Sequence, residues 1–371
     1  GISYLLKEQA ELVRTRIDEL CRNRNYDKDF WETALYSNKR LVVQARVVSA
    51  VDFIEINTYE QLRAIDDNSD HLKSDAIEVI ADVLKVEMND ITNITVLKKG
   101  MTNRSFLFVC HNQKYIMRIP GEGTEKLIDR KREAEVYNII SDKKICDDNL
   151  YMNPENGYRI TRFIENSRVC NPTNREDVIK CMDKLRRFHQ MNLTVSHEFN
   201  LFAQIEFYES LWNGEKSVYR DYQETKANVL SLRQYIETHA DRKSLTHIDA
   251  VPDNFLFFTN EQGVEEVCLI DWEYAAMQDP HVDIAMFCIY SFYRKEQIDD
   301  LIQIYFEEAC PFEIQVKIYC YIAVCGLLWS NWCEYKRMLG VDFGEYSLRQ
   351  YRYAKEYSRI VHDILGGESL K

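Results

Sequence analysis

The chain has 371 residues, of which 29% are charged and 46% hydrophobic, and its formal net charge is -13. This length is sufficient for two domains, or for a two-lobed enzyme with an appendage. The negative charge argues against nucleic acid, or an anionic membrane surface, as the main partner. The 11 cysteines include no Cys-x-x-Cys pair, which indicates buried thiols in a reducing compartment and argues against a disulfide framework or a zinc site.

The longest apolar run, residues 318–330, is too short to span a bilayer and predicts a buried helix. The first residues do not have the pattern of a signal peptide. We therefore expect a soluble, cytoplasmic protein without membrane insertion.

The first 70 residues predict a small α/β appendage. Residues 8–22 carry apolar side chains at helical spacing, and two strand-like runs follow within residues 41–56. Thr58 and Gln61 have the spacing of a capping box at the start of another short helix. The polar stretch 66–73 then predicts a linker to the rest of the chain.

Beyond the linker, the sequence predicts a β-rich region that begins after a helix capped by Ser74. Strand-like runs between residues 94 and 119 are joined by short turns, and the first turn contains Gly100, Thr102 and Asn103. In kinases such a turn closes over the phosphates of ATP through its backbone N–H groups. An ordinary β-hairpin would have the same local pattern.

Arg118 lies in the next apolar strand, and the helix predicted from about 125 to 141 carries Glu133. A strand cation paired with a helix carboxylate positions the α- and β-phosphates of ATP in kinases. The alternative is a surface ion pair of little energetic value. The charged residues just before Glu133 predict the solvated face of the same helix: Asp129, Arg130, Lys131 and Arg132.

The stretch 245–274 carries the strongest functional signal. Asp249 is followed five positions later by Asn254, a short hairpin comes next, and Asp271 follows a buried strand. This order is typical of kinase-type phosphoryl transfer. Asp249 would accept the proton of the attacking hydroxyl, while Asn254 and Asp271 would hold the Mg²⁺ that neutralises the ATP phosphates. The same residue types form ordinary turns, but the complete ordered set favours catalysis. Asp283, further along, is expected to cap or brace this loop.

Aromatic residues concentrate in the helices predicted after residue 296. Trp329 and Trp332 share a helix face, and Tyr346 follows shortly afterwards. Core packing is the ordinary explanation for each ring, but rings near an active site also bind quaternary ammonium groups through cation–π attraction. Together with the carboxylate of Glu273, these rings predict a cage for a cationic substrate.

From about Ser74 to its end, the chain resembles the choline/ethanolamine kinases, most closely the bacterial choline kinases that supply phosphocholine for surface decoration. The resemblance is carried by residues 100–103, 115–124, 128–133, 246–254, 269–274 and 328–330. One departure is Ile248, where these kinases usually have Asn, and it removes no metal ligand.

The resemblance implies a two-lobed, protein-kinase-like α+β fold, with residues 71–165 as the ATP-binding small lobe and 166–371 as the large lobe. It implies ATP and Mg²⁺ as cofactors and choline as the acceptor. The implied site contains Asp249 as base, Asn254 and Asp271 as magnesium ligands, Arg118 with Glu133 at ATP, and Glu273, Tyr274 and Trp329 near choline.

Residues 1–70 resemble the C-terminal end of a phosphocholine cytidylyltransferase-type nucleotidyltransferase domain. The matching pieces are residues 1–4, 30–31 and 53–58 with the helix after them. The Gly-rich nucleotide-binding loop of such domains is absent, and Asn57 stands where the family usually has an Asp implicated in metal binding. We therefore expect the kinase part of a bifunctional protein that carries an incomplete transferase.

Two alternatives stay open at this point. Ethanolamine and aminoglycoside kinases share the same base and metal ligands, although the aromatic residues favour choline. A catalytically inert scaffold on the same fold has no chemical need for Asp249, Asn254 and Asp271 together. The sequence makes no prediction about the oligomeric state.

Overall fold

The computed structural model describes residues 7–22, 31–35, 62, 74–97, 103–121, 128–240, 242–307 and 309–368. The chain forms two compact units, Gly1–Ile56 and Asn57–Lys371. In the first unit, α1 (Lys7–Leu20) contacts the 3-10 helix η2 (Trp31–Leu35). Arg16 donates a hydrogen bond of 3.1 Å to the carbonyl of Ala34 across this contact. The strands predicted within 41–56, the linker 66–73, Gly100 and Thr102 lie outside the described residues.

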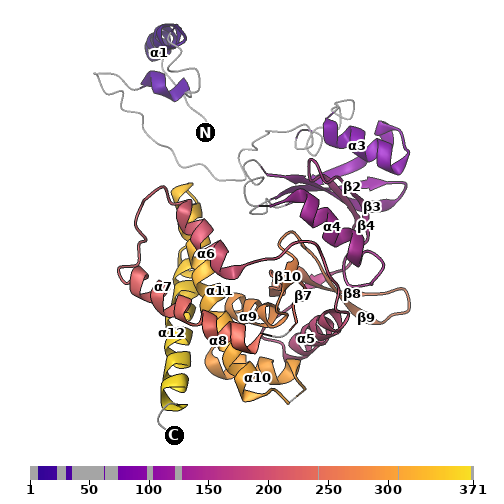
Figure 1. The fold of residues 1–371 in the computed structure, drawn as a ribbon. Helices are drawn as coiled ribbons and strands as arrows, with labels where there is room; N and C mark the ends of the chain where they lie inside the picture. Colours follow the sequence, from indigo (N-terminus) through magenta and orange to yellow (C-terminus); the bar gives the residue numbers. More distant parts are fainter. Residues whose placement is uncertain are drawn as a thin grey trace. The chain divides into compact units, whose positions relative to one another are not determined.

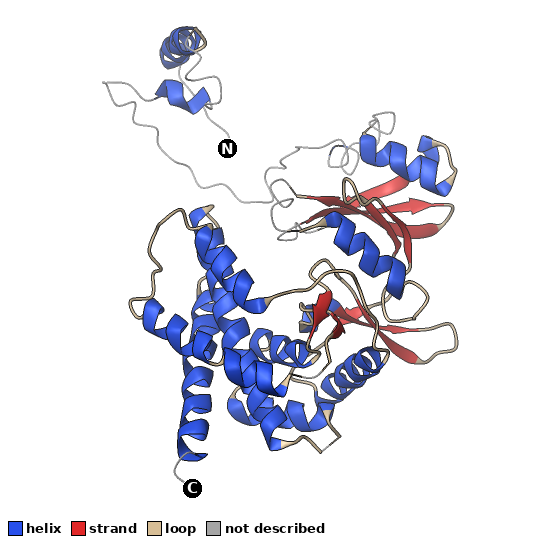
Figure 2. Ribbon diagram, viewed as in Figure 1, coloured by secondary structure: helices blue, strands red, loops and turns tan. Residues whose placement is uncertain are grey.

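The second unit begins with a five-stranded antiparallel sheet in the order β1-β2-β3-β5-β4, accompanied by two helices (Figures 1 and 2). The strands are β1 (Thr92–Val96), β2 (Asn103–Cys110), β3 (Gln113–Pro120), β4 (Asn149–Met152) and β5 (Arg159–Arg162), and the helices are α3 (Asp75–Leu84) and α4 (Arg130–Ile140). As predicted, Ser74 caps α3 by accepting the N–H of Ile77. Between these helices lies η5 (Met88–Asp90), a single 3-10 turn.

The β2–β3 hairpin has a two-residue turn, His111 and Asn112, and both have positive φ angles of 48° and 63°. Two consecutive left-handed residues give the turn that matches the twist of antiparallel strands, and Asn adopts this conformation readily. Alternate residues of β2, such as Phe106 and Phe108, then face the core that α3 covers.

The rest of the unit is a helical lobe (Figure 1). Its helices are α5 (Arg175–Gln190), α6 (Leu201–Ser210), α7 (Tyr222–Ser231), α8 (Arg233–His239), α9 (His281–Tyr290), α10 (Lys295–Tyr305), α11 (Phe312–Met338) and α12 (Glu345–Glu368). The two lobes together are the predicted α+β architecture. All 11 cysteines are free thiols.

Helix α11 is the centre of this lobe and packs against α12, α9 and α6. Its residues 316–334 are all buried, which confirms the prediction of a buried helix over the apolar run. Among the described helices, α11 alone has the length and apolarity to cross a membrane, and 78% of that apolar window is buried inside the protein. Gly326 allows α12 to approach closely, because a Cβ there would lie 2.7 Å from the carbonyl oxygen of Gln350.

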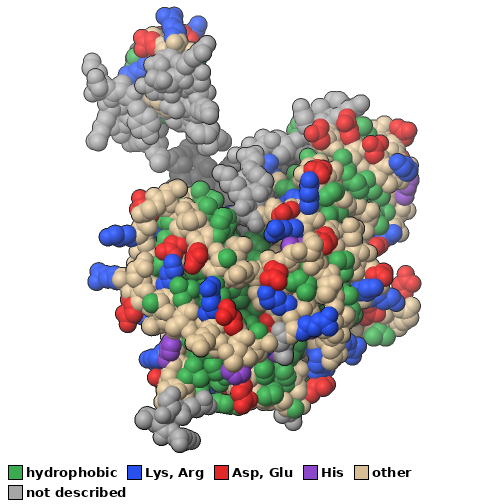
Figure 3. Space-filling model, viewed as in Figure 1, with side chains coloured by type: hydrophobic (Ala, Val, Ile, Leu, Met, Phe, Trp, Pro, Cys, Tyr) green, Lys and Arg blue, Asp and Glu red, His purple; other side chains and the backbone are tan. Residues whose placement is uncertain are grey.

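Short strands of the helical lobe position residues 245–274, the segment with the strongest functional signal. Strand β7 (Ser244–Thr246) pairs with β10 (Ala276–Gln278), and β8 (Phe255–Thr259) pairs with β9 (Glu265–Leu269) and β6 (Arg168–Val169). The 3-10 turn η7 (Pro252–Asn254) connects β7 to β8. These pairings bring the segment after β7 and the segment after β9 close together. The surface drawn in Figure 3 carries basic and acidic side chains side by side, without a large area of one sign.

Candidate active site

A cavity of about 380 Å³ lies between the five-stranded sheet and the helical lobe. Most of the side chains that the sequence singled out line it: Asn103, Arg118, Asp249, Asn254, Asp271, Glu273, Tyr274, Trp329, Trp332 and Tyr346. Glu133 reaches the site through its contact with Arg118. Tertiary folding therefore brings together residues that are spread over more than 240 positions of the chain.

The loop that carries Asp249 is held by Asp283, as the sequence predicted. The two carboxylate oxygens of Asp283 accept the backbone N–H groups of His247 at 3.0 Å and Ile248 at 2.8 Å. Ile248 has a φ of +70°, a conformation that is strained for a β-branched residue and that Asn adopts more easily. The conformation persists because Asp283 binds both N–H groups.

Hydrogen bonds connect Asn254 with Asp249 and with Ile270, the residue before Asp271. The side-chain amide of Asn254 donates to the Asp249 carbonyl at 2.8 Å and to Oδ2 of Asp249 at 3.2 Å. The backbone carbonyl of Asn254 accepts the N–H of Ile270, and His247 Nε2 lies 2.9 Å from the Ile270 carbonyl. Burial lowers the pKa of His247 to about 4, so its imidazole is neutral near pH 7 and donates this hydrogen bond.

Asp249 and Asp271 are partly shielded from water. Burial raises the pKa of Asp249 to about 7; the charge of Glu273 adds to the effect, and the hydrogen bond from Asn254 opposes it. Burial and the charge of Glu273 also raise the pKa of Asp271 well above its ordinary value. A divalent cation would relieve this crowding of negative charge.

Asn254 and Asp271 could hold a metal ion that takes few ligands from the protein. Among the described residues, no group of three or more His, Cys, Asp or Glu is arranged to hold a metal ion. Asn254 and Asp271 instead offer an amide oxygen and a carboxylate. Mg²⁺ commonly takes one or two carboxylates and completes its shell with water and substrate phosphates.

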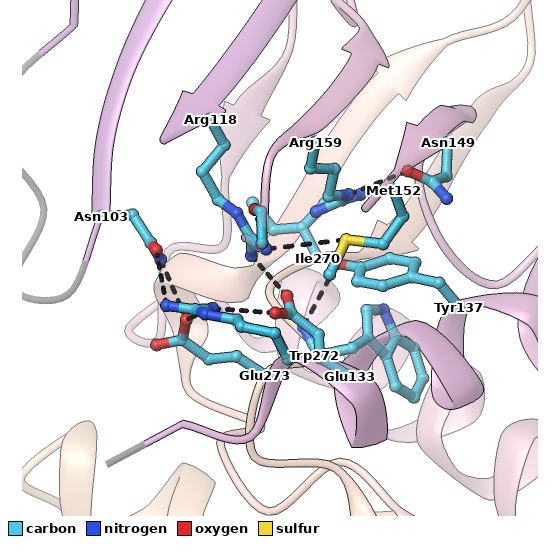
Figure 4. Close-up of polar contacts among 12 residues, drawn as sticks. Asn103, Arg118, Glu133, Tyr137, Asn149, Met152, Arg159, Ile270, Trp272 and Glu273 are labelled. Atoms are coloured by element: carbon cyan, nitrogen blue, oxygen red, sulfur yellow. Dashed lines mark hydrogen bonds and ion pairs between the residues drawn. The ribbon is translucent and has the colours of Figure 1, made fainter. Parts of the chain in front are cut away.

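On the sheet side of the cavity, the predicted pair between Arg118 and Glu133 is formed. Their N–O distance is 2.5 Å, and both side chains are buried (Figure 4). Burial would raise the pKa of Glu133, but Arg118 and Arg130 outweigh that effect and hold it below its ordinary value. The pair is therefore fully charged near neutral pH.

The prediction that Arg130 belongs to a solvated face is wrong. Asp129 caps α4 by accepting the N–H groups of Lys131 and Arg132, which leaves Arg130 in the first turn and directed inward. Its guanidinium lies 2.8 Å from Glu133 and 3.4 Å from Glu273, and only 8% of the side chain is exposed. The i,i+3 spacing of Arg130 and Glu133 is the sequence signal that could have shown this contact.

Sequence reasoning also missed Arg159. It lies directly opposite Arg118 across the β3–β5 pair, so the two guanidinium groups share one face of the sheet. Arg159 contacts both carboxylate oxygens of Asp147 at 2.6 Å, and both residues line the cavity. Two adjacent guanidinium groups in one cavity are suited to a polyphosphate.

Five rings line the cavity and are here called the aromatic wall: Tyr274, Tyr290, Trp329, Trp332 and Tyr346. Tyr274 and Trp329 have ring centroids 5.7 Å apart at 87°, and Trp329 and Trp332 have centroids 5.8 Å apart at 72°. Tyr346 packs edge-on against Tyr290 at 5.8 Å. The rings are packed in the core and also line the cavity. Tyr290, from α9, was not predicted and extends the set found from the sequence.

Comparison with known proteins gives consistent matches. The Choline/ethanolamine kinase family matches residues 94–310. Protein LicA of Haemophilus influenzae is 26% identical over 262 residues, which are 68% of this chain and 76% of that protein. The crystal structure of choline kinase LicA from Streptococcus pneumoniae has a TM-score of 0.65 at 29% identity and covers 76% of this chain and 96% of that chain. A LicA structure in complex with AMP has a TM-score of 0.63 at 27% identity and covers 78% of this chain and 100% of that chain.

Proposed function

Because the chain belongs to the choline/ethanolamine kinase family, we propose that it transfers the γ-phosphate of ATP to the hydroxyl group of choline. One observation carries the choice of acceptor: Asp249 and the aromatic wall line the same cavity. A trimethylammonium group held among the rings directs its short hydroxyl arm toward Asp249. Such a group donates no hydrogen bonds, and ring faces attract it through cation–π interactions.

In the proposed reaction, Asp249 accepts the proton of the choline hydroxyl as its oxygen forms a bond to the γ-phosphorus. The bond between that phosphorus and the β–γ bridging oxygen breaks, and ADP leaves. Asp249 must be deprotonated to accept the proton, and Asn254 orients its carboxylate through the 3.2 Å contact.

The phosphates of ATP are assigned to the sheet side of the cavity. Arg118, fixed by Glu133, and Arg159, fixed by Asp147, present their charges there without needing to reorganise. Asn103 lies at the start of β2. We propose that Asn103, Gly100 and Thr102 belong to a turn that covers the phosphates. Mg²⁺ held by Asn254 and Asp271 would neutralise charge on the transferred phosphoryl group.

The deciding experiment measures ATP-dependent phosphorylation of choline, ethanolamine and a panel of aminoglycosides by the same folded protein. We expect the highest kcat/KM for choline and detectable, lower turnover of ethanolamine. A higher kcat/KM for ethanolamine or an aminoglycoside would contradict the proposed acceptor. The absence of turnover with every acceptor would contradict the kinase assignment and favour the inert scaffold.

The resemblance of residues 1–70 to a cytidylyltransferase stays a prediction, since the family match begins at residue 94. We propose that this segment is the end of such a domain and that it contributes no catalytic group to the kinase. Removal of residues 1–68 should leave choline phosphorylation within about twofold of the intact chain. Loss of activity in a folded truncated protein would contradict this proposal.

A further inference from the structure

We propose that Arg130 is a specificity-determining residue, because its ion pair with Glu273 withholds that carboxylate from the acceptor site. The inference rests on the proposed function, in which the aromatic wall surrounds the ammonium group of the acceptor, and on Glu273, which lines the same cavity. Glu273 lines the cavity together with its neighbours Asp271 and Tyr274 and the rings of the aromatic wall. The negative charge that Glu273 presents to a bound acceptor therefore affects which ammonium groups bind well.

The carboxylate of Glu273 is engaged from the sheet side of the cavity. Nη1 of Arg130 lies 3.4 Å from Oε2 of Glu273. Nδ2 of Asn103 donates a hydrogen bond of 2.9 Å to the same oxygen, and Figure 4 shows Asn103 beside Glu273. The Glu273 side chain is only 3% exposed. In this low-dielectric position the guanidinium offsets part of the negative charge that an acceptor would otherwise meet.

Arg130 is held in place by three further contacts. Its guanidinium binds Oε2 of Glu133 at 2.8 Å and Oδ1 of Asn103 at 3.3 Å. Its aliphatic stem packs against Gly157, where a Cβ would lie 2.8 Å from Cδ of Arg130. The Arg130 side chain is therefore ordered beside Glu273 before an acceptor binds, so binding does not have to order it.

The ion pair has opposite consequences for two kinds of acceptor. A quaternary ammonium has no N–H group and gains its binding from the ring faces, so it does not need the Glu273 carboxylate as an acceptor. A primary ammonium has three N–H donors that lose water on entering an aromatic cavity. With Glu273 already bound by Arg130 and Asn103, those donors find fewer acceptors, and binding weakens. Arg130 thus favours choline by making the site poor for primary amines.

The test compares kcat/KM for choline and for ethanolamine in wild-type protein and in Arg130→Gln, at one saturating ATP concentration. We expect the choline-to-ethanolamine ratio to fall by about tenfold in Arg130→Gln, the factor set by one hydrogen bond to a charged acceptor. Arg130→Lys, which keeps the charge, should retain a ratio closer to that of the wild type. The matched control is Arg132→Gln, because Arg132 is exposed on the same helix and contacts Asp129. Its ratio should stay within about twofold of the wild type.

A second background separates specificity from general damage to the ATP site. In Glu273→Gln, which lacks the carboxylate, the further change Arg130→Gln should leave the ratio unaltered. Damage to ATP positioning would lower kcat/KM for both acceptors equally, and an unchanged ratio in Arg130→Gln overturns the proposal. A ratio that still shifts in the Glu273→Gln background overturns it as well.

Two further measurements keep the outcome interpretable. If Arg130→Gln does not fold, Asn103→Ala removes the hydrogen bond that Asn103 donates to Glu273 and should shift the ratio in the same direction. An unchanged ratio in folded Asn103→Ala then overturns the proposal. The proposed function is judged separately, by choline turnover in the wild type. Active wild-type protein with an Arg130-independent ratio refutes only the role of Arg130.

Discussion

The carboxylate of Asp283 binds the backbone N–H of Ile248 at 2.8 Å and so holds the residue before Asp249 at a φ of +70°. The other oxygen of Asp283 accepts the N–H of His247 and lies 2.9 Å from Nε2 of His189. One fully buried carboxylate on α9 therefore determines the conformation of the proposed catalytic loop. His189 also belongs to this support.

Replacing Asp283 by Ala should destabilise the protein and lower its activity. Two buried N–H groups would lose their acceptor, and unsatisfied groups of this kind cost roughly 1–3 kcal/mol each. We expect the free energy of unfolding to fall by about 2–5 kcal/mol, with kcat lowered in the fraction that folds. Urea denaturation measures the first quantity. Asp142→Ala, at an exposed ion pair, is the control and should leave the free energy of unfolding almost unchanged. Equal stability of the two variants would show that the brace is dispensable.

Asp249→Asn should lower kcat by about 10²- to 10⁴-fold, the range in which a positioned base contributes to catalysis. The amide has the size of the carboxylate but cannot accept the hydroxyl proton. The KM for choline should change little, because the aromatic wall is intact. Steady-state kinetics with ATP and choline give both numbers. Turnover near that of the wild type would remove Asp249 from the role of base.

The acid limb of the pH–rate profile should reflect the raised pKa of Asp249. Burial moves this pKa upward to about 7, so the protonated, inactive form persists to higher pH than for an ordinary Asp. At subsaturating Mg²⁺, kcat/KM should therefore fall about tenfold per pH unit below pH 7, and rise to a plateau above it. Higher Mg²⁺ should shift the midpoint to lower pH, because the cation favours the deprotonated carboxylates. A flat profile from pH 5.5 to 8.5 at low Mg²⁺ would contradict this account.

Trp329→Leu should raise the KM for choline by roughly tenfold and leave the KM for ATP almost unchanged. Leucine keeps apolar bulk but lacks the ring quadrupole, which contributes about 1–2 kcal/mol to binding a desolvated cation. Ethanolamine, which can donate hydrogen bonds, should be less affected. Phe312→Leu, at the exposed start of the same helix, is the matched control. An unaltered choline KM in folded Trp329→Leu would assign this ring to core packing alone.

Gly157→Ala should destabilise the protein more than Gly263→Ala does. Both glycines have positive φ angles, +71° and +78°, so both substitutions carry a similar backbone penalty of about 1 kcal/mol. Only at Gly157 would the new Cβ meet neighbours, at 2.7 Å from Pro120 Cγ and 2.8 Å from Arg130 Cδ. We expect an additional loss of about 1–3 kcal/mol from this overlap. Thermal or urea unfolding of both variants measures the difference, and equal losses would show that the Arg130 stem moves aside freely.

Local sequence determined the parts of the site whose members are close along the chain. Asp249, Asn254 and Asp271 lie within 23 residues, and a hairpin between them leaves the backbone few ways to arrange the three side chains. Arg118 and Glu133 were paired correctly for a similar reason, since they lie only 15 positions apart on the consecutive elements β3 and α4. The buried helix α11 followed from its continuous apolar run. The two-lobed fold was expected from the resemblance and is confirmed by the relatives of known structure.

Only the tertiary structure decided the contacts between distant elements. Arg130 contacts Glu273, which lies 143 positions later in the chain. Arg118 lies opposite Arg159 because β3 and β5 are neighbours in the sheet. Four of the five rings of the aromatic wall come from α9, α11 and α12, which pack together, and Gly326 allows close contact between α11 and α12. Residue spacing specifies neighbours within a turn or a hairpin. Which charged residue is withdrawn from water is decided by the long-range packing that surrounds it, because desolvation depends on every neighbour in space.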